Sequence, residues 1–429
     1  MTGDRTTGRP DARAVARRVL DRVEKDGAWA TPALDGELAR AGLDERDRRL
    51  AAELVYGVLR HRARVDRALA AHADLARTPP RVVTALRVAA YQLLLLDRVP
   101  QHAAVNDAVS AARAFGGAKL GGFANAVLRK LAQHGEPALP ADPRARVELE
   151  YSLPAWIVDE LAAVSSADEL GPRAAAFATS APLVGRVNRL RTTREALLAR
   201  LRADGHEARA LDGYPHAFAL DGGEPARIAS FAAGEWTVQD AGAQRVAELA
   251  APRAGQRVLD ACAGVGGKST HLAELADDRA VIDAADLSAT KLGLLADTAK
   301  RLGLRSITAH TCDLRDRSAA LAATYDLIVL DAPCTGLGVL RRHPDAKWRL
   351  TAGDVARMAA LQAELLDAVV PRLAPGGTLV YSVCTFTRAE GPDQVAQLVA
   401  RTPLRVVRED RTWPPDADAF YVASLQAPS

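Results

Sequence analysis

The segment "VLDACAGVGGKSTH", residues 258–271, decides the fold, because it reads as a strand, a glycine-rich turn and the start of a helix. Glycines let a backbone approach a ligand closely, and the first N–H groups of a helix can then bind the ligand's polar atoms. The segment is not a P-loop, because Cys262 stands where that motif requires glycine. It is not a dinucleotide fingerprint either, because Ser269 stands in place of the third glycine.

Strand-like and helix-like segments alternate around this turn, from about residue 233 to residue 429. The strand-like runs are "QRVLDACAG", "AVIDAADL", "SITAHTCD", "YDLIVLDAPC" and "GTLVYSVCT". This alternation predicts a Rossmann-like α/β domain over 233–429, with a mainly parallel sheet covered by helices on both faces. Ligands of such sheets bind beyond the carboxyl ends of the strands.

The chain before residue 233 divides into two further parts. Residues 1–135 show helical apolar spacing throughout, with separate helical stretches at 46–72, 103–116 and 121–135, and predict an all-helical domain. Residues 136–232 begin with a proline-containing break and predict a small α/β linker domain, with "LVGRVNRL" as a strand and "TTREALLARLRADG" as a helix.

Composition favours a cytoplasmic protein. The start of the sequence has no apolar run typical of a secretory signal, no segment is long enough to span a membrane, and the four cysteines show no metal-ligand spacing. We therefore expect no membrane, no metal and no oligomer. Residues 1–130 carry 23 Lys and Arg against 15 Asp and Glu, which favours either an RNA-binding surface or a solvated arginine-rich helical bundle.

Two aspartates follow successive strands after the glycine turn. Asp286 lies 20 residues after Gly266, where a ribose-binding acid belongs, and Asp313 ends the next strand. The two side chains could instead be helix caps. Their order after a glycine turn nevertheless predicts a nucleoside site, with Asp286 at the ribose and Asp313 near the base.

Two cysteines follow two other strands, and we expect both thiols to face the same crevice. Cys334 and Asp331 follow "LIVL", and Cys384 follows "TLVYSV". Buried cysteines are common, but these lie at the ends of apolar runs. A thiol beside a methyl donor suits methylation of cytosine C5, because thiolate addition at C6 makes C5 nucleophilic. Asp331 could then supply or relay a proton at N3 or bind the exocyclic amine.

Four motifs together resemble the S-adenosylmethionine-dependent RNA cytosine-5 methyltransferases of the NOL/NOP2/Sun family. They are "DACAGVGGKSTH", "DAADLSATKL", "DAPCTGLGVLRRHPDAKW" and "LVYSVCTFTRAEG". The segment "HAAVNDAVSAARAFGGAKLGGFANAVLRKL" is similar to a NusB-type RNA-binding domain, and this combination resembles the bacterial 16S rRNA methyltransferases of the family. The resemblance covers nearly the whole chain and is least distinct in the linker domain.

The resemblance implies a role for individual residues. Cys384 would be the nucleophile, Cys334 would assist product release, and Asp331 would serve both catalysis and cofactor binding. The implied S-adenosyl-L-methionine site consists of Cys262, Ala263, Gly264, Val265, Gly266, Gly267, Lys268, Asp286, Asp313 and Asp331. Two departures are Gly264-Val265, where the family often has Ala-Pro, and Ala389 before Glu390, whose role stays open.

The implied partner is 16S rRNA or a small-subunit assembly intermediate. A basic cluster after Cys334 could contact phosphates near the target base, although it could also be a solvated loop. Its members are Arg341, Arg342, His343 and Lys347. Three alternatives remain: a cytosine-5 methyltransferase of another rRNA or of tRNA, a DNA cytosine-5 methyltransferase in which Cys334 attacks, and an RNA-binding or assembly protein without catalysis.

Overall fold

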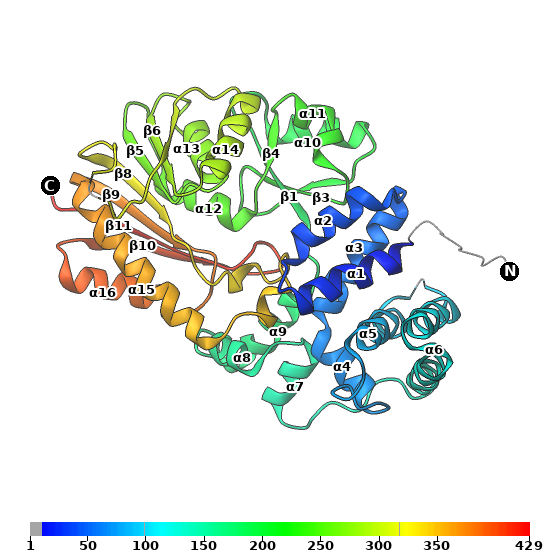
Figure 1. Cartoon of the computed structure of the whole chain (residues 1–429). Helices are drawn as coiled ribbons and strands as arrows, with labels where there is room; N and C mark the ends of the chain where they lie inside the picture. The colour runs from blue at the N-terminus through cyan, green and yellow to red at the C-terminus, as the bar shows by residue number, and fades with distance from the viewer. Residues whose placement is uncertain (1–10, 98, 317) are drawn as a thin grey trace. The chain divides into compact units, whose positions relative to one another are not determined.

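The computed structural model describes residues 11–97, 99–316 and 318–429, and it divides into two compact units (Figure 1). The helical unit comprises Met1–Asp159, Phe177–Thr179 and Leu340–Arg349, and the sheet unit comprises Glu160–Ala176, Ser180–Val339 and Leu350–Ser429. Residues 1–10 of the expected helical domain lie outside the described residues.

The helical unit packs its helices around one core of small and branched apolar residues. Its helices are α1 (Ala12–Lys25), α2 (Ala30–Ala41), α3 (Glu45–Arg60), α4 (Arg62–Ala70), α5 (Pro80–Leu95), α6 (Gln101–His134) and α7 (Pro143–Glu150). The stretch expected as one helix over 46–72 is two, because the backbone leaves helical geometry at His61. Gly116 and Gly117 likewise interrupt α6, where two separate helices were expected.

The small domain is built on a four-stranded antiparallel sheet in the order β2-β3-β1-β4, which belongs to the sheet unit, whereas the start of α8 and the last residue of α9 belong to the helical unit. Its elements are α8 (Ala155–Ala162), α9 (Ala167–Phe177), β1 (Leu183–Val187), α10 (Arg194–Ala203), β2 (Ala208–Ala210), β3 (Ala217–Leu220), a 3₁₀ turn (Pro225–Arg227), α11 (Ala229–Ala232) and β4 (Trp236–Val238). Strand β4 pairs with β1, so this sheet uses residues beyond 232.

The large sheet has seven strands in the order β10-β11-β9-β8-β5-β6-β7. The five strands from β9 to β7 are parallel, and β11 and β10 add an antiparallel edge. Its elements are α12 (Ala241–Ala250), β5 (Arg257–Ala261), α13 (Gly267–Leu275), β6 (Val281–Asp286), α14 (Ala289–Leu302), β7 (Ile307–Thr311), β8 (Tyr325–Asp331), 3₁₀ turns (Leu337–Val339, Ala346–Trp348 and Val370–Arg372), α15 (Ala352–Val369), β9 (Leu373–Val383), α16 (Pro392–Arg401), β10 (Arg405–Thr412) and β11 (Phe420–Gln426).

Helices cover both faces of the large sheet, as Figure 1 shows for α12–α14 on one side and α15 and α16 on the other. Alternate residues of one strand serve the two faces: Leu327 packs with the α12–α14 side and Ile328 with the α15–α16 side. The expected fold class, with a helical domain, a small α/β domain and a Rossmann-like domain, is therefore confirmed.

Candidate active site

The glycine turn joins β5 to α13 and is held in a strained, tight conformation. Cys262, Gly264 and Gly266 all have positive φ, at 63°, 58° and 83°. At Gly266 a Cβ atom would lie 2.3 Å from Cγ of Leu295, so a side chain has no room there. The Gly264 amide donates to Oδ2 of Asp286 at 2.9 Å, which ties the turn to the end of β6.

A cavity of about 460 Å³ opens beside this turn, at the carboxyl ends of the parallel strands. This volume lies within the usual range for small-molecule sites. Its lining residues are Cys262, Gly264, Ala285, Asp286, Leu287, Ser288, Lys291, Cys312, Asp313, Leu314, Arg315, Asp331, Ala332, Pro333, Cys334, Leu361, Leu365 and Cys384. The two aspartates expected to bind a nucleoside, Asp286 and Asp313, thus line the same cavity as the two cysteines, Cys334 and Cys384.

Asp286 and Asp313 both line the cavity but are held differently. Asp286 accepts from Gly264 with one oxygen and from the Ser288 amide with the other, at 2.8 Å, and its remaining lone pairs suit ribose hydroxyls. Asp313 is paired with Arg315 at 2.8 Å, and hydrogen bonds from Arg315 hold the pKa of its carboxyl below the usual value. Asp286 therefore fits the expected sugar contact better than Asp313 fits a base contact.

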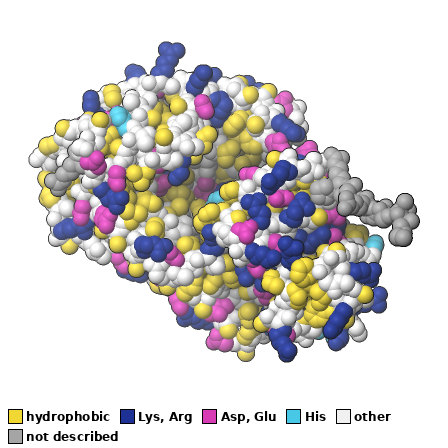
Figure 2. Space-filling view, viewed as in Figure 1, with side chains coloured by type: hydrophobic (Ala, Val, Ile, Leu, Met, Phe, Trp, Pro, Cys, Tyr) yellow, Lys and Arg dark blue, Asp and Glu magenta, His cyan; other side chains and the backbone are white. Residues whose placement is uncertain are grey.

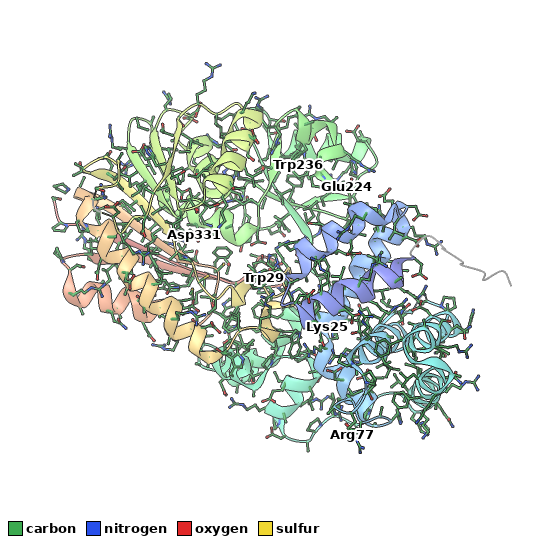
Figure 3. The ribbon with its side chains drawn as sticks, in the orientation of Figure 1. Lys25, Trp29, Arg77, Glu224, Trp236 and Asp331 are labelled. Carbon is green, nitrogen blue, oxygen red and sulfur yellow. The ribbon has the colours of Figure 1, made fainter. Side chains whose placement is uncertain are left out.

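Asp331 ends β8, and Figure 3 marks its position. Lys268 from α13 forms an ion pair with its Oδ2 atom, and the hydroxyl of Ser382 donates to Oδ1 at 2.8 Å. Burial alone would lower the pKa of Lys268, but the charge and hydrogen bond of Asp331 outweigh burial and raise that pKa. The site therefore holds an ammonium and a carboxylate in direct contact.

The sulfur atoms of Cys334 and Cys384 lie 3.3 Å apart, within hydrogen-bond distance for sulfur. The hydrogen bond with Cys384 raises the pKa of the Cys334 thiol well above its usual value, and burial and the charge of Cys384 add to this effect. The two thiols are therefore close enough to exchange a proton directly.

Asp260 lies on β5, two residues before Cys262 of the glycine turn, and is fully buried. It accepts a hydrogen bond from the Ser269 hydroxyl, while its Oδ1 atom has no partner among the described residues. Burial raises the pKa of Asp260 to about 7, against the opposing hydrogen bond from Ser269.

The basic cluster after Cys334 does not match the phosphate-binding surface expected from the sequence. Arg341 and Lys347 are buried, and Lys347 donates to the backbone carbonyl of Arg60 at 2.7 Å within the helical unit. Burial, with the charge of Arg60, lowers the pKa of Lys347 well below its usual value. A phosphate cannot reach these two side chains in this conformation, whereas His343 is exposed and Arg342 partly exposed.

Basic side chains are numerous on the face of the helical unit that Figure 2 shows, and acidic side chains lie among them. Arg87, for example, bonds Asp66 and Glu24, both at 2.6 Å. Part of the positive charge expected to face RNA is therefore engaged within the unit.

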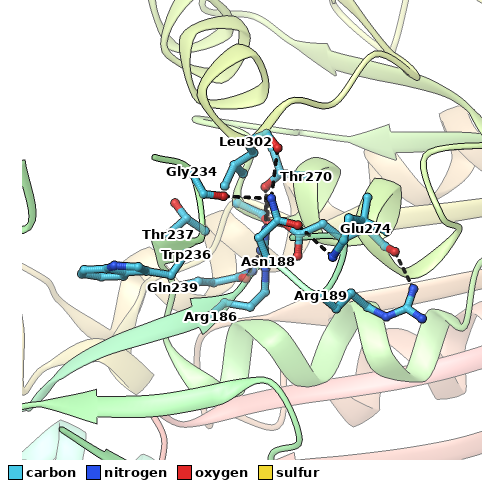
Figure 4. Close-up of polar contacts among 12 residues, drawn as sticks. Arg186, Asn188, Arg189, Gly234, Trp236, Thr237, Gln239, Thr270, Glu274 and Leu302 are labelled. Atoms are coloured by element: carbon cyan, nitrogen blue, oxygen red, sulfur yellow. Dashed lines mark hydrogen bonds and ion pairs between the residues drawn. The ribbon is translucent and has the colours of Figure 1, made fainter. Parts of the chain in front are cut away.

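Arg186 on β1 was not expected at the site, and Figure 4 shows its contacts. Its guanidinium is fully buried and bonds both carboxylate oxygens of Glu274 on α13, at 2.7 and 3.1 Å. It also donates to the carbonyl of Gly267 at 2.8 Å, to Thr270 at 3.1 Å and to Gln239. The small domain thus supports the glycine turn from behind.

Comparison with known proteins identifies the family. The family model described as "16S rRNA methyltransferase RsmB/F" matches residues 247–426 of this chain. The model of the NusB family matches residues 10–133, and that of an RsmF/B-like ferredoxin-like domain matches residues 153–227. A probable ribosomal RNA small subunit methyltransferase B of Bacillus subtilis is 34% identical, over 91% of this chain and 88% of its own length. The ribosomal RNA small subunit methyltransferase B of Salmonella newport is also 34% identical, over 96% and 98%. The chain belongs to the RsmB/F family of 16S rRNA methyltransferases.

Solved structures agree with this fold. PH0851 matches with a TM-score of 0.81 at 23% identity, over 98% of this chain and 99% of its own. NSun6 from Pyrococcus horikoshii, solved with SFG, matches with a TM-score of 0.59 at 18% identity, over 64% and 98%. The cofactor of this RsmB/F-family chain is S-adenosylmethionine, and the glycine turn, the cavity and Asp286 fit an adenosyl group.

The described residues contain neither a membrane-spanning helix nor a metal-binding group. None of their helices has the length and apolar character needed to cross a membrane. They also contain no group of three or more His, Cys, Asp or Glu side chains arranged to hold a metal ion.

Proposed function

We propose that this chain methylates C5 of a cytosine in 16S rRNA through a covalent bond between Cys384 and cytosine C6. The observation that carries the proposal is the pair of thiols 3.3 Å apart, at the ends of β8 and β9, in the wall of the cofactor cavity. The relatives named as small subunit rRNA methyltransferases support the choice of RNA.

The first step forms the adduct. The Cys384 thiolate donates an electron pair to C6, and the C5–C6 π electrons make C5 nucleophilic. The Asp331 carboxylate, which Lys268 and Ser382 hold in place, relays a proton from the Lys268 ammonium to N3 or accepts a hydrogen bond from the exocyclic amine. S-adenosylmethionine supplies the electrophilic methyl group that C5 takes up.

The last step releases the product. Cys334 gives its thiol proton to the departing Cys384 sulfur and takes the proton that leaves C5, while the C6–S bond breaks and the C5–C6 double bond is restored. The proton at N3 returns through Asp331 to Lys268, and one thiol proton of the pair passes to solvent. The contact of 3.3 Å and the raised pKa of Cys334 support this assignment of roles.

We assign the remaining groups as follows. Residues 262–268 (Cys262, Ala263, Gly264, Val265, Gly266, Gly267 and Lys268), Asp286 and Asp313 hold the cofactor. Arg342 and His343 approach the RNA backbone. The NusB-type domain binds structured RNA, either free 16S rRNA or an assembling small subunit in the cytoplasm.

A denaturing-gel assay for covalent RNA adducts tests the proposal. Wild type, Cys334→Ala and Cys384→Ala each receive S-adenosylmethionine and unmodified 16S rRNA. We expect a stable adduct with Cys334→Ala, and neither adduct nor methylation with Cys384→Ala. An adduct that survives loss of Cys384 but not of Cys334 would reverse the roles and favour the DNA type of mechanism. Absence of adduct and methyl transfer in all three would favour a non-catalytic RNA-binding protein.

A further inference from the structure

Glu390 lies between β9 and α16 and is completely buried, although the mechanism above gives it no part. Its Oε1 atom accepts from the backbone amide of Thr335 at 2.8 Å and from Gln362 at 3.2 Å. Its Oε2 atom accepts from the hydroxyls of Thr335 at 2.6 Å and Thr387 at 3.0 Å. In the described part of the chain, no Lys or Arg side chain pairs with this carboxylate.

A buried carboxylate with only neutral donors is costly unless its hydrogen bonds are well formed. Four donors surround Glu390, and two of them belong to Thr335, the residue after Cys334. The carboxylate therefore fixes both the backbone and the side chain of the turn that carries Cys334.

The same network reaches the turn that carries Cys384. The hydroxyl groups of Thr335 and Thr385 lie 3.1 Å apart, so the residues that directly follow the two cysteines are hydrogen-bonded to each other. The Gly338 amide donates to the carbonyl of Cys384 at 3.0 Å. Glu390 thus closes a set of contacts that crosses between the turns after β8 and β9.

We infer that Glu390 is a positioning residue that holds the Cys334 turn against Cys384 and so sets the distance between the two thiols. The role in product release rests on the proposed function, but the effect on sulfur geometry does not. Loss of this carboxylate moves Cys334 away from the departing sulfur and leaves the attack by Cys384 less affected.

Thiol oxidation measures the sulfur geometry without RNA. Diamide converts two thiols to a disulfide while its N=N bond is reduced to a hydrazine, and adjacent thiols react fastest. In Glu390→Gln the amide presents N–H where Thr335 needs an acceptor, so we expect the Cys334–Cys384 disulfide to form about tenfold more slowly or worse, in line with the sensitivity of such reactions to misplacement. Mass mapping of the peptides separates this disulfide from any involving Cys262 or Cys312.

The matched control is Asp283→Asn, which alters another buried carboxylate of the same unit, one that accepts from Tyr325 at 2.8 Å and contacts His310. We expect disulfide formation near the wild-type rate there. Thr335→Val keeps the backbone amide bond to Glu390 but loses the hydroxyl contacts, so an intermediate rate is expected. This variant also tests the inference if Glu390→Gln fails to fold. A wild-type rate in Glu390→Gln or Thr335→Val, or an equal slowing in Asp283→Asn, would overturn the inference.

The adduct assay then tests the consequence for release. Glu390→Gln should retain a single-turnover burst of methyl transfer but accumulate adduct, as Cys334→Ala does. Parallel loss of burst and adduct would indicate a general structural role and contradict positioning. If neither wild type nor Cys334→Ala transfers methyl or forms an adduct, the proposed function fails, while the diamide result still decides the role of Glu390 in thiol geometry.

Discussion

Replacement of Arg186 by methionine removes a guanidinium that is fully buried and bonds both carboxylate oxygens of Glu274. Methionine fills a similar length, so the principal loss is electrostatic. Removing one partner of a buried ion pair leaves the other charge uncompensated and costs about 3–5 kcal/mol. We expect the free energy of unfolding in urea to fall by this amount, a large part of the 5–15 kcal/mol typical of a domain.

The double variant Arg186→Met/Glu274→Met separates stability from cofactor binding. It removes both charges, so most of the lost stability should return. It does not restore the hydrogen bond to the Gly267 carbonyl, which follows the glycine turn directly. Calorimetric affinity for S-adenosylhomocysteine should therefore remain reduced in both the single and the double variant.

Arg189→Met is the matched control. Arg189 pairs with Asp277 at 2.8 Å in an exposed position, so its loss should cost no more than about 1 kcal/mol. The reasoning is refuted if Arg186→Met destabilises as little as Arg189→Met. It is also refuted if the double variant binds S-adenosylhomocysteine as wild type does, because the Gly267 contact would then carry no cofactor affinity.

Three further predictions concern other residues. Burial raises the pKa of Asp260 from 3.8 to about 7, so between about pH 4 and 7 the folded chain keeps a proton that the unfolded chain loses. As pH rises through this window, the free energy of unfolding of wild type should therefore fall by up to about 4 kcal/mol relative to that of Asp260→Asn. Urea denaturation at several pH values measures this, and a difference between the two proteins that does not change with pH would contradict the buried acid. Gly266→Ala should lower the free energy of unfolding in urea more than Gly264→Ala does, because a methyl group at Gly266 would lie 2.3 Å from Cγ of Leu295, whereas one at Gly264 meets no protein atom within 4 Å. Both glycines have positive φ, so each variant also carries backbone strain, and equal losses of stability would argue against this packing. Lys347→Met should lower the free energy of unfolding by about 1–3 kcal/mol, because it leaves the carbonyl of Arg60 without its donor. The salt dependence of RNA binding should stay unchanged, and a slope of log affinity against log salt concentration that is smaller by about one would instead show a phosphate contact.

The large sheet and the meeting of the two cysteines could be predicted because both depend on patterns local to the sequence. Strand and helix alternate regularly after residue 233, and parallel strands bring their carboxyl ends to one edge. Cys334 and Cys384 each follow a strand directly, so the shared edge places them together although 50 residues separate them.

The buried charges could not be predicted, because their environment depends on residues far away in the chain. "RRHPDAKW" is as polar as a solvated loop, and the sequence does not show that the carbonyl of Arg60, far away in the chain, accepts a hydrogen bond from buried Lys347. Arg186 interrupts an apolar strand, a signal of an unusual position, but its partner Glu274 lies 88 residues further on. Glu390 shows no sequence signal for its donors, which come from Thr335, Gln362 and Thr387.

The position of residues 340–349 within the helical unit has a consequence for synthesis on the ribosome. Trp348 donates to the Leu59 carbonyl at 2.6 Å, and Asp345 accepts from the first amide of α2 at 2.9 Å. These partners emerge roughly 190 residues after the unit's main segment ends at Asp159. At a translation rate of about 5–20 residues per second, roughly 10–40 s pass between the synthesis of Asp159 and that of Asp345 and Trp348. The N-terminal helices thus complete their native contacts only after the turn bearing Cys334 has been translated.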